Sequence, residues 1–375
     1  MTERFERTYW RRPGTAVALV GLLVVNLTWA YPDYNWDMLA YIAAGYQFGG
    51  MTPESAHELT YRQVRESIPP SNYQLLTESN AYRQLMSLDQ SAFTQQLPGY
   101  RMKLLYPSLL LLSSRIGFNP VFASVFISRC AYVAIGLVVL IWLGSFLSPL
   151  ATLITAWAAM STSFMLDLAQ LSTPDALSTF VILLGLWLVF QKGRFRAGLA
   201  VLLVSVLVRP DNVLWLAAVA GYRAITDRTS RPVAIVAAAA GAVLALSVAA
   251  WSGSQGWATL FHHGFMERLP NLDTFQPTLS PLGYLRVYLR ETHPANLPPF
   301  VMLFGLLCGW LVVLRVKLNG WADRQAHLLA VLVAFAAMHW LLYPDDDRFF
   351  VAAYLVTLIA LARHLTQREP AVSMR

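Results

Sequence analysis

The stretch VFASVFISRCAYVAIGLVVLIWLGSF, residues 121–146, contains a single charged residue, Arg129. At about 1.5 Å of rise per residue, a helix of this length crosses a hydrocarbon core about 30 Å thick. Comparable apolar runs recur along the whole chain, at 14–30, 149–166, 174–190, 196–208, 211–225, 232–251, 297–314, 327–343 and 348–364. Because a chain in lipid must satisfy its backbone hydrogen bonds internally, this pattern predicts an all-α polytopic membrane protein with about ten transmembrane helices.

Composition supports this class and excludes others. The 375 residues are 56% hydrophobic and 13% charged, whereas an average soluble domain is about 25% charged. The net charge of +7 comes from short loops rather than from a basic patch with interleaved aromatic residues, so we expect no nucleic-acid partner. Cys130 and Cys308 both lie in apolar runs, which fits buried free thiols better than a disulfide framework or a zinc site.

Basic residues fix the expected orientation of the chain. They gather at both ends of the sequence and after the fourth, sixth and eighth runs: Arg4, Arg7, Arg11, Arg12, Lys192, Arg194, Arg196, Arg223, Arg228, Arg231, Arg315, Lys317, Arg324, Arg363, Arg368 and Arg375. Loops rich in Lys and Arg stay on the cytoplasmic side of a membrane. We therefore expect a multi-pass protein of the cytoplasmic (inner) membrane, with both termini cytoplasmic and the first run as an uncleaved anchor.

Two longer segments, 31–120 and 252–296, are extracytoplasmic in this topology. The first is expected to form short amphipathic helices at 36–48, 53–67, 73–85 and 89–97, and Thr52 is expected to cap the second of these. The stretches at 104–112 and 281–292 are expected to lie in the membrane interface. Since the sequence has no internal repeat, residues 1–375 are expected to form one membrane domain with outer elaborations.

Two neighbouring runs, 196–208 and 211–225, are unusually short for membrane spans. At about 1.5 Å per residue, neither crosses a bilayer without help. We expect a helical hairpin whose polar turn, Val208-Arg209-Pro210-Asp211, lies below the outer membrane surface in a protein-lined or wet cavity. The alternative is a pair of ordinary helices with ragged ends.

The carboxylates between the runs fall on the outer face: Asp33, Asp37, Asp167, Asp175, Asp211, Asp345, Asp346 and Asp347. A row of acids at the edge of the hydrocarbon is costly unless a cavity, a cation or a reaction requires it. Lys103, Arg209 and Arg348 lie on the same face. A carboxylate there can take the proton of an acceptor hydroxyl, while the cations hold a lipid-linked phosphate. An acid-rich pocket can also hold a divalent cation, so the cofactor is left open.

Several of these residues also have structural interpretations. Asp175 also fits a first-turn acid that complements a helix dipole, and the Asp345–Asp347 run also fits a solvated turn. Arg129 also fits a residue that snorkels or pairs with an outer acid. His262 and His263 are expected to be loop residues, and His339 a polar packing residue.

The order of these features resembles a known superfamily. A long first outer loop with an early Asp, the KLLYP element (103–107), an outer Asp opening the fourth span, short middle helices and a final acid/Arg turn are similar to the GT-C glycosyltransferases. Within them, the chain resembles bacterial polyprenyl-phosphate-sugar-dependent enzymes related to protein O-mannosyltransferases and lipid A aminoarabinose transferases. The sequence has Tyr106-Pro107 where that family usually has paired prolines, and Trp36-Asp37 where an Asp-Glu pair is common.

The resemblance implies roles for particular residues. Asp37 corresponds to the family's acid/base or metal-associated residue, and Lys103 to the basic residue that contacts the lipid phosphate. On this basis we expect an inverting glycosyltransferase that takes a sugar from a polyprenyl-phosphate donor to a lipid, glycan or protein acceptor at the extracytoplasmic face. The expected catalytic residue is Asp37, and the expected substrate-binding residues are Lys103, Tyr106, Asp175, Arg209, Asp346, Asp347 and Arg348. The donor sugar and the acceptor are left open.

Two other classes of protein fit parts of the same pattern. A secondary transporter or flippase would use an Asp/Arg-lined site in a broken helix. Against this alternative, the acids gather at one face rather than at the midplane, and a transporter does not need an outer segment as long as 31–120. A polysaccharide polymerase or ligase is the third candidate, although such enzymes usually carry their large loop later in the chain.

Overall fold

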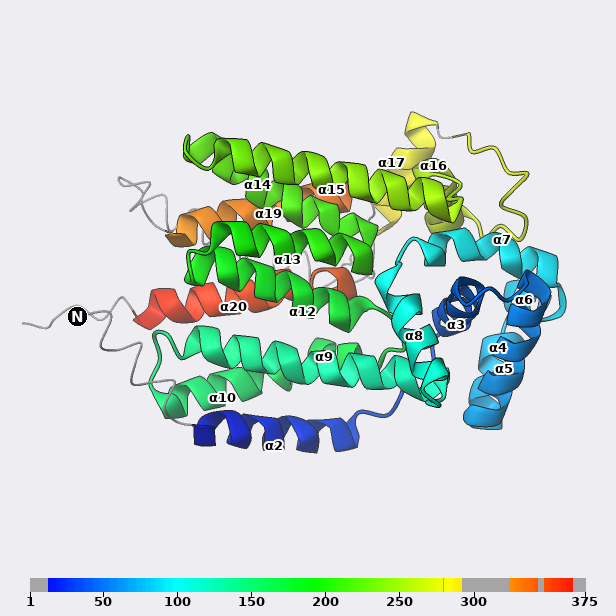
Figure 1. The fold of residues 1–375 in the computed structure, drawn as a ribbon, viewed down its shortest axis with the longest axis horizontal. Helices are drawn as coiled ribbons and strands as arrows, with labels where there is room; N and C mark the ends of the chain where they lie inside the picture. The colour runs from blue at the N-terminus through cyan, green and yellow to red at the C-terminus, as the bar shows by residue number, and fades with distance from the viewer. Residues whose placement is uncertain (1–12, 279, 292–323, 343–346, 367–375) are drawn as a thin grey trace, which may run out of the picture.

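The computed structural model describes residues 13–278, 280–291, 324–342 and 347–366. Within them every regular element is a helix, and the β-type contact is an isolated parallel bridge between Asp33 and Leu171. The prediction of an all-α chain is confirmed for this part of the protein. Figure 1 shows a bundle of long apolar helices with a second group of shorter helices gathered at one end.

The bundle contains ten helices in the described part of the chain: α2 (Pro13–Trp29), α9 (Pro120–Leu143), α10 (Pro149–Met160), α11 (Ser163–Gln170), α12 (Asp175–Leu186), α13 (Phe195–Val208), α14 (Val213–Thr226), α15 (Arg231–Ser252), α19 (Arg324–Leu342) and α20 (Val351–Thr366). A π-helical turn, η1 (Trp187–Gln191), extends α12. Each predicted apolar run therefore coincides with helix, apart from 297–314, which lies outside the described residues. One continuous core, which includes Tyr132, Leu183 and Trp215, joins these helices.

By length and composition, α9 and α15 could each cross a membrane, and the bent pair α10–α11 could form a third span. Shorter apolar helices lie at 13–29, 175–191, 195–208, 330–342 and 351–363. The predicted span at 149–166 is formed by α10 and the first part of α11, and the two helices are bent by 64° at the break between them. At this break, the hydroxyls of Ser161 and Thr162 donate to the carbonyls of Trp157 and Ala159. Such back-bonding offers the backbone an alternative to the helical pattern.

The short helices α13 and α14 form the expected hairpin. Arg209 and a 3-10 turn, η2 (Pro210–Asn212), join them. Arg209 is 9% exposed and Val208 is fully buried, so protein surrounds the turn. Asn212 fixes the turn from inside, because its side-chain amide donates to Ser178 Oγ at 2.8 Å and to the Ser205 carbonyl at 2.9 Å.

The segment between α2 and α9 folds as six helices around its own small core: α3 (Asp37–Phe48), α4 (Pro53–Ser67), α5 (Pro70–Thr77), α6 (Ala81–Leu88), α7 (Gln90–Arg101) and α8 (Leu105–Arg115). Thr52 caps α4 as predicted, accepting from the Ser55 amide at 3.3 Å. The expectation of one helix over 73–85 was wrong. Asn80 starts a new helix there by accepting from the Arg83 amide at 2.9 Å. The expected break at Pro98-Gly99 was also wrong, because α7 continues to Arg101.

The second outer segment contributes α16 (Trp257–Phe261), a π-helical turn η3 (His262–Met266) and α17 (Pro281–Glu291). The expected helix at 281–292 is confirmed as far as Glu291. Tyr284 and Tyr288 on α17 both donate a hydroxyl hydrogen bond to the Leu341 carbonyl at the end of α19. This segment therefore braces the bundle end that leads to Arg348.

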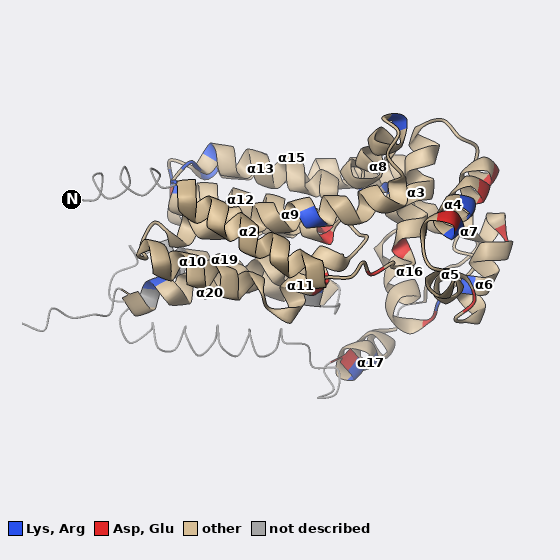
Figure 2. Cartoon of the chain, turned by 90° about the horizontal axis from the view of Figure 1, so that it is seen from below, with Lys and Arg blue, Asp and Glu red and all other residues tan. Residues whose placement is uncertain are grey.

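Two further expectations concern cysteines and charge. Cys130 lies exposed on α9, so the expectation that it is buried was wrong, and Cys308 lies outside the described residues. The connections from η1 to α13 and from α14 to α15 lie at the end of the bundle opposite α3–α8 (Figures 1 and 2). These connections carry Lys192, Arg194 and Arg228. Within the described residues, these two basic loops and the acids Asp37, Asp175 and Asp211 therefore lie at opposite ends of the bundle, as the sequence predicts.

Candidate functional site

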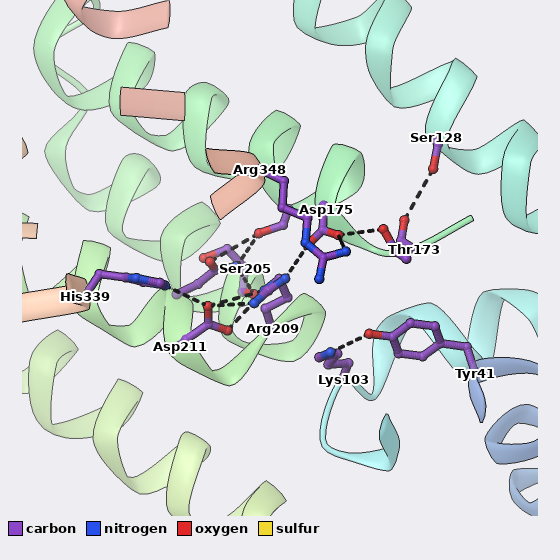
Figure 3. A network of polar contacts seen from close by, with 12 residues as sticks. Tyr41, Lys103, Ser128, Thr173, Asp175, Ser205, Arg209, Asp211, His339 and Arg348 are labelled. Carbon is purple, nitrogen blue, oxygen red and sulfur yellow. Dashed lines mark hydrogen bonds and ion pairs between the residues drawn. The ribbon is translucent and has the colours of Figure 1, made fainter. Parts of the chain in front are cut away.

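Arg209 is the centre of a buried ionic network at the end of the bundle that faces α3–α8 (Figure 3). Its Nε donates to both carboxylate oxygens of Asp211, at 3.1 and 3.3 Å, and its Nη2 donates to Oδ2 at 3.0 Å. Its Nη1 donates to Asp175 Oδ1. The guanidinium also lies 4.0 Å from the ring centroid of Phe349. A planar fork can make all these contacts at once, whereas an ammonium group cannot.

Asp175 contacts three side chains of the network. It begins α12, where the helix dipole favours a carboxylate, and it is 3% exposed. Thr173 Oγ1 donates to Asp175 Oδ2 at 2.5 Å, and Arg348 Nη1 lies 3.7 Å from the same oxygen. Asp175 is therefore more than a first-turn acid, because it is the common partner of Arg209 and Arg348.

Arg348 and its neighbours arrive from the far end of the sequence. The 3-10 turn η4 (Asp347–Phe349) packs against α11 and α12, and this brings Arg348 to Asp175. The Arg348 guanidinium lies 4.9 Å from the Phe349 ring centroid. Of the two predicted acids, Asp347 begins η4, and Asp346 lies outside the described residues.

His339 extends the network into the bundle. Its Nε2 lies 3.4 Å from Asp211 Oδ2, and its ring packs against Phe335, Phe349 and Phe350. A polar cavity of about 10 Å³ lies between His339 and Phe349 on one side and Asp175, Ser178, Arg209 and Asn212 on the other. This volume is about that needed for one water molecule. A larger substrate would therefore have to approach from the opposite side of Arg209, where Lys103 lies (Figure 3).

Lys103 lies between this network and a second polar cluster on the outer helices. Its Nζ donates to the Tyr41 hydroxyl and lies 5.0 Å from the Tyr41 ring centroid and 5.4 Å from that of Tyr100. Burial and, secondarily, the positive charge of Arg209 lower the pKa of Lys103 to about 8, against the opposing effect of nearby carboxylates. Those carboxylates are Asp37, Asp175 and Asp211. The Lys103 ammonium therefore interacts electrostatically with acids of both clusters.

Asp37 forms the other end of the second cluster. It is the first residue of α3, and its Oδ1 accepts a hydrogen bond of 2.8 Å from the Tyr100 hydroxyl. Two hydrogen bonds attach the residues before Asp37 to the segment that leads into α12. The backbone N–H of Asn35 donates to Ser172 Oγ at 3.1 Å, and the Ser172 hydroxyl donates to the Asp33 backbone carbonyl at 3.1 Å. The backbone that carries Asp37 is therefore attached to the backbone that leads to Asp175.

Tyr106 has a different place from the one its predicted role suggests. Its side chain is fully buried, its hydroxyl donates to the Ser124 carbonyl at 3.2 Å, and its ring packs edge-on against Tyr41 at 5.1 Å. Tyr106 therefore supports Tyr41 from behind. Arg129 donates to the Ala30 carbonyl at 2.7 Å and forms no ion pair with an acid among the described residues.

Among the residues that the structure describes, no group of three or more His, Cys, Asp or Glu side chains is arranged to hold a metal ion. Asp175 and Asp211 already bind the Arg209 guanidinium. Within the described part of the chain, Asp37 is the carboxylate of the site that has an oxygen, Oδ2, with no hydrogen-bond donor. Its Oδ2 could therefore accept a proton from a bound hydroxyl group.

Sequence reasoning missed three residues of the site. His339 lies within an apolar run, and an ionisable side chain inside such a run is by default a functional candidate. That signal was present and was assigned to packing. Tyr41 and Tyr100 had no such signal, because their hydroxyls join the site only through the packing of α3 against α7 and the turn after it.

The site thus consists of a cationic network around Arg209 and an acid-bearing tyrosine cluster around Asp37, with Lys103 between them. No protein-family model, curated protein or solved structure matches this chain. Its function therefore has to be argued from the geometry of these two clusters.

Proposed function

We propose that this chain is an inverting glycosyltransferase of the cytoplasmic membrane, of the GT-C type. It transfers a sugar from a polyprenyl-phosphate donor to a lipid, glycan or protein acceptor at the extracytoplasmic face. In this proposal the apolar helices, together with the run at 297–314, make about ten spans, and both termini are cytoplasmic. The helices α3–α8 then cover the outer ends of the spans.

The observation that carries the proposal is the convergence of three cations at the end of an apolar bundle. These cations come from three distant parts of the sequence. Arg209 and Arg348 form ion pairs with Asp175, and Lys103 lies near enough to interact with it electrostatically. A lipid phosphate at a membrane surface would reach such a site with its isoprenoid chain still in the bilayer. Three of the five N–H groups of Arg209 donate to Asp175 and Asp211. Within the described part of the chain the other two donate to no side chain or carbonyl, so in this proposal they donate to a phosphate oxygen.

The proposed reaction follows from the separation of the two clusters. The acceptor hydroxyl attacks the anomeric carbon of the sugar and gives its proton to Asp37. The bond between the anomeric carbon and the phosphate oxygen breaks, and polyprenyl phosphate leaves with the bonding electron pair. Lys103, Arg209 and Arg348 stabilise the negative charge that develops on this phosphate. Because attack and departure occur on opposite faces, the anomeric configuration inverts.

The test begins with cells that lack the protein. We expect an isoprenoid-linked sugar to accumulate in their membranes, and mass spectrometry of the lipid extract identifies it. Purified protein in liposomes should then convert this lipid to free polyprenyl phosphate when an extract containing the acceptor is added. The Asp37→Asn variant should bind the lipid and release about 10²–10⁴-fold less polyprenyl phosphate, the usual cost of losing a general base.

One observation favours a transporter instead: Arg209 and Asp211, in the turn of the short α13–α14 hairpin, form a buried ionisable group with His339 on α19. The same liposomes distinguish the two functions. A flippase would move the labelled lipid between leaflets without cleaving it, and this movement would depend on Arg209. Lipid movement without any release of polyprenyl phosphate would replace the transferase proposal.

A further inference from the structure

Tyr41 and Tyr100 link the two functional groups of the outer cluster. Tyr100, on α7, donates its hydroxyl to Asp37 Oδ1 at 2.8 Å. Tyr41, on α3, receives a hydrogen bond from the Lys103 ammonium. The two rings meet edge to face, with centroids 5.0 Å apart and planes inclined at 78°. Each tyrosine thus holds one charged group, and the rings hold each other.

The surroundings of this pair are rigid. Tyr41 is 1% exposed and packs edge-on against Tyr106, while Tyr100 packs against Trp36. Phe93 contacts Trp36 from the other side of the same core. A phenol held by such packing has few ways to turn, so its hydroxyl points in a fixed direction.

We propose that Tyr41 and Tyr100 act as a pair of positioning residues that set where Lys103 and Asp37 lie relative to each other. This inference rests on the proposed function, in which Lys103 binds the donor phosphate and Asp37 is the base. Tyr100 occupies Oδ1 of Asp37 and so leaves Oδ2 for the acceptor proton. Tyr41 holds the Lys103 ammonium where it can reach the phosphate beside Arg209.

The proposal predicts different effects for the two hydroxyls. Tyr100→Phe keeps the ring and removes the hydrogen bond to Asp37, so kcat should fall about 10–100-fold while donor affinity stays within about twofold. Tyr41→Phe removes the acceptor for Lys103, so donor affinity should fall about tenfold with a smaller effect on kcat. Affinity is measured with polyprenyl phosphate in nanodiscs, and kcat with the lipid-linked sugar that accumulates in cells lacking the protein.

The split between kcat and donor affinity is a readout that simple structural damage would not produce, because a loss of folding would lower both quantities in both variants.

Tyr61→Phe is the matched control, because Tyr61 is buried in the same core and contacts His57 and Phe93 rather than the charged pair. It should leave kcat and donor affinity unchanged. If Tyr100→Phe keeps the wild-type kcat while Asp37→Asn abolishes transfer, the positioning role is wrong and the proposed function stands. If Asp37→Asn itself retains transfer, the proposed assignment of the base is wrong. Equal losses of kcat and affinity in both tyrosine variants would also overturn the division of roles.

Discussion

At the scale of single residues, the site is organised by the cost of burying charge. Asp175 and the Arg209 side chain are almost fully buried, and Arg209 satisfies two carboxylates at once. Removing one member of a buried ion pair typically costs about 3–5 kcal/mol, because the partner is left uncompensated. The network is therefore held in place by its own electrostatics, whether or not a ligand is present.

This argument gives a prediction for Arg209. Arg209→Ala leaves Asp175 and Asp211 without their shared partner, so unfolding free energy should fall by about 3–5 kcal/mol. Arg209→Lys keeps the charge but not the fork, so it should bind polyprenyl phosphate better than Arg209→Ala and worse than the wild type. Thermal unfolding in detergent and binding in nanodiscs measure the two effects. Arg115→Ala, at an exposed arginine on α8, is the control and should change neither.

A second residue-scale prediction concerns the pH dependence of Lys103. Its pKa is lowered from 10.5 to about 8, so the ammonium loses its proton as the pH rises through about 8. Binding of polyprenyl phosphate should weaken over that range, and Lys103→Arg should bind with no such dependence. The effect of Lys103 on folding stability runs in the opposite direction with pH from its effect on phosphate binding. Between about pH 8 and 10.5 the unfolded state holds more protons, so the free energy of unfolding should rise with pH. Binding of equal strength at pH 7 and pH 9 would contradict this prediction.

At the scale of elements, local sequence signals predicted the helices well and their interruptions poorly. Thr52 marks the start of α4 because its side chain caps the next turn, and Pro53 follows it. The break between α5 and α6 was missed, although Asn80 is a good capping residue, because the apolar spacing continues across it. Pro98 was read as a helix end, but the helix tolerates it within a buried face of α7.

The candidate site was predictable to the extent that its charges stand out in an apolar sequence. Asp175, Arg209 and Arg348 were found this way, and the structure brings them together. Their partners were harder to find, because Tyr41 and Tyr100 look like ordinary aromatic core residues. Which hydroxyl meets which charge depends on how α3 packs against α7, and a single sequence carries no information on that register.

An element-scale prediction concerns the attachment of α3 to α12. Ser172 is fully buried and bonds both the Asn35 amide and the Asp33 carbonyl. Ser172→Ala leaves both groups without this partner, at a typical cost of about 1–3 kcal/mol. Amide hydrogen exchange at Asn35 should therefore become about tenfold faster or more, with a loss of transfer activity. Thr229→Ala, at the opposite end of the bundle, is the control and should change amide exchange near residue 229 but not at Asn35. Unchanged exchange at Asn35 would show that other contacts hold α3.

At the scale of the whole molecule, the distribution of charge separates the bundle into two ends with different chemistry. One end carries the site and the helices α3–α8, and the other carries the basic loops (Figure 2). A membrane selects the orientation of such a molecule, because short loops rich in Lys and Arg remain in the cytoplasm. In the proposed orientation the site would face away from cytoplasmic nucleotide sugars, and this is the reason for proposing a lipid-linked donor.

This orientation can be tested by cysteine labelling in intact cells. The native Cys130 and Cys308 are first replaced by serine, and single cysteines are introduced at exposed positions of each end. A membrane-impermeant maleimide should label positions 71 and 276, beside the site end, and should reach positions 194 and 229 only after the cells are opened. Because the same helices connect both sets of positions, their labelling patterns must be complementary. Labelling of position 194 in intact cells would place the basic end outside. The carboxylates and Lys103 would then face the cytoplasm, where a nucleotide-linked donor could reach them, and the proposal of a lipid-linked donor at the extracytoplasmic face would have to be abandoned.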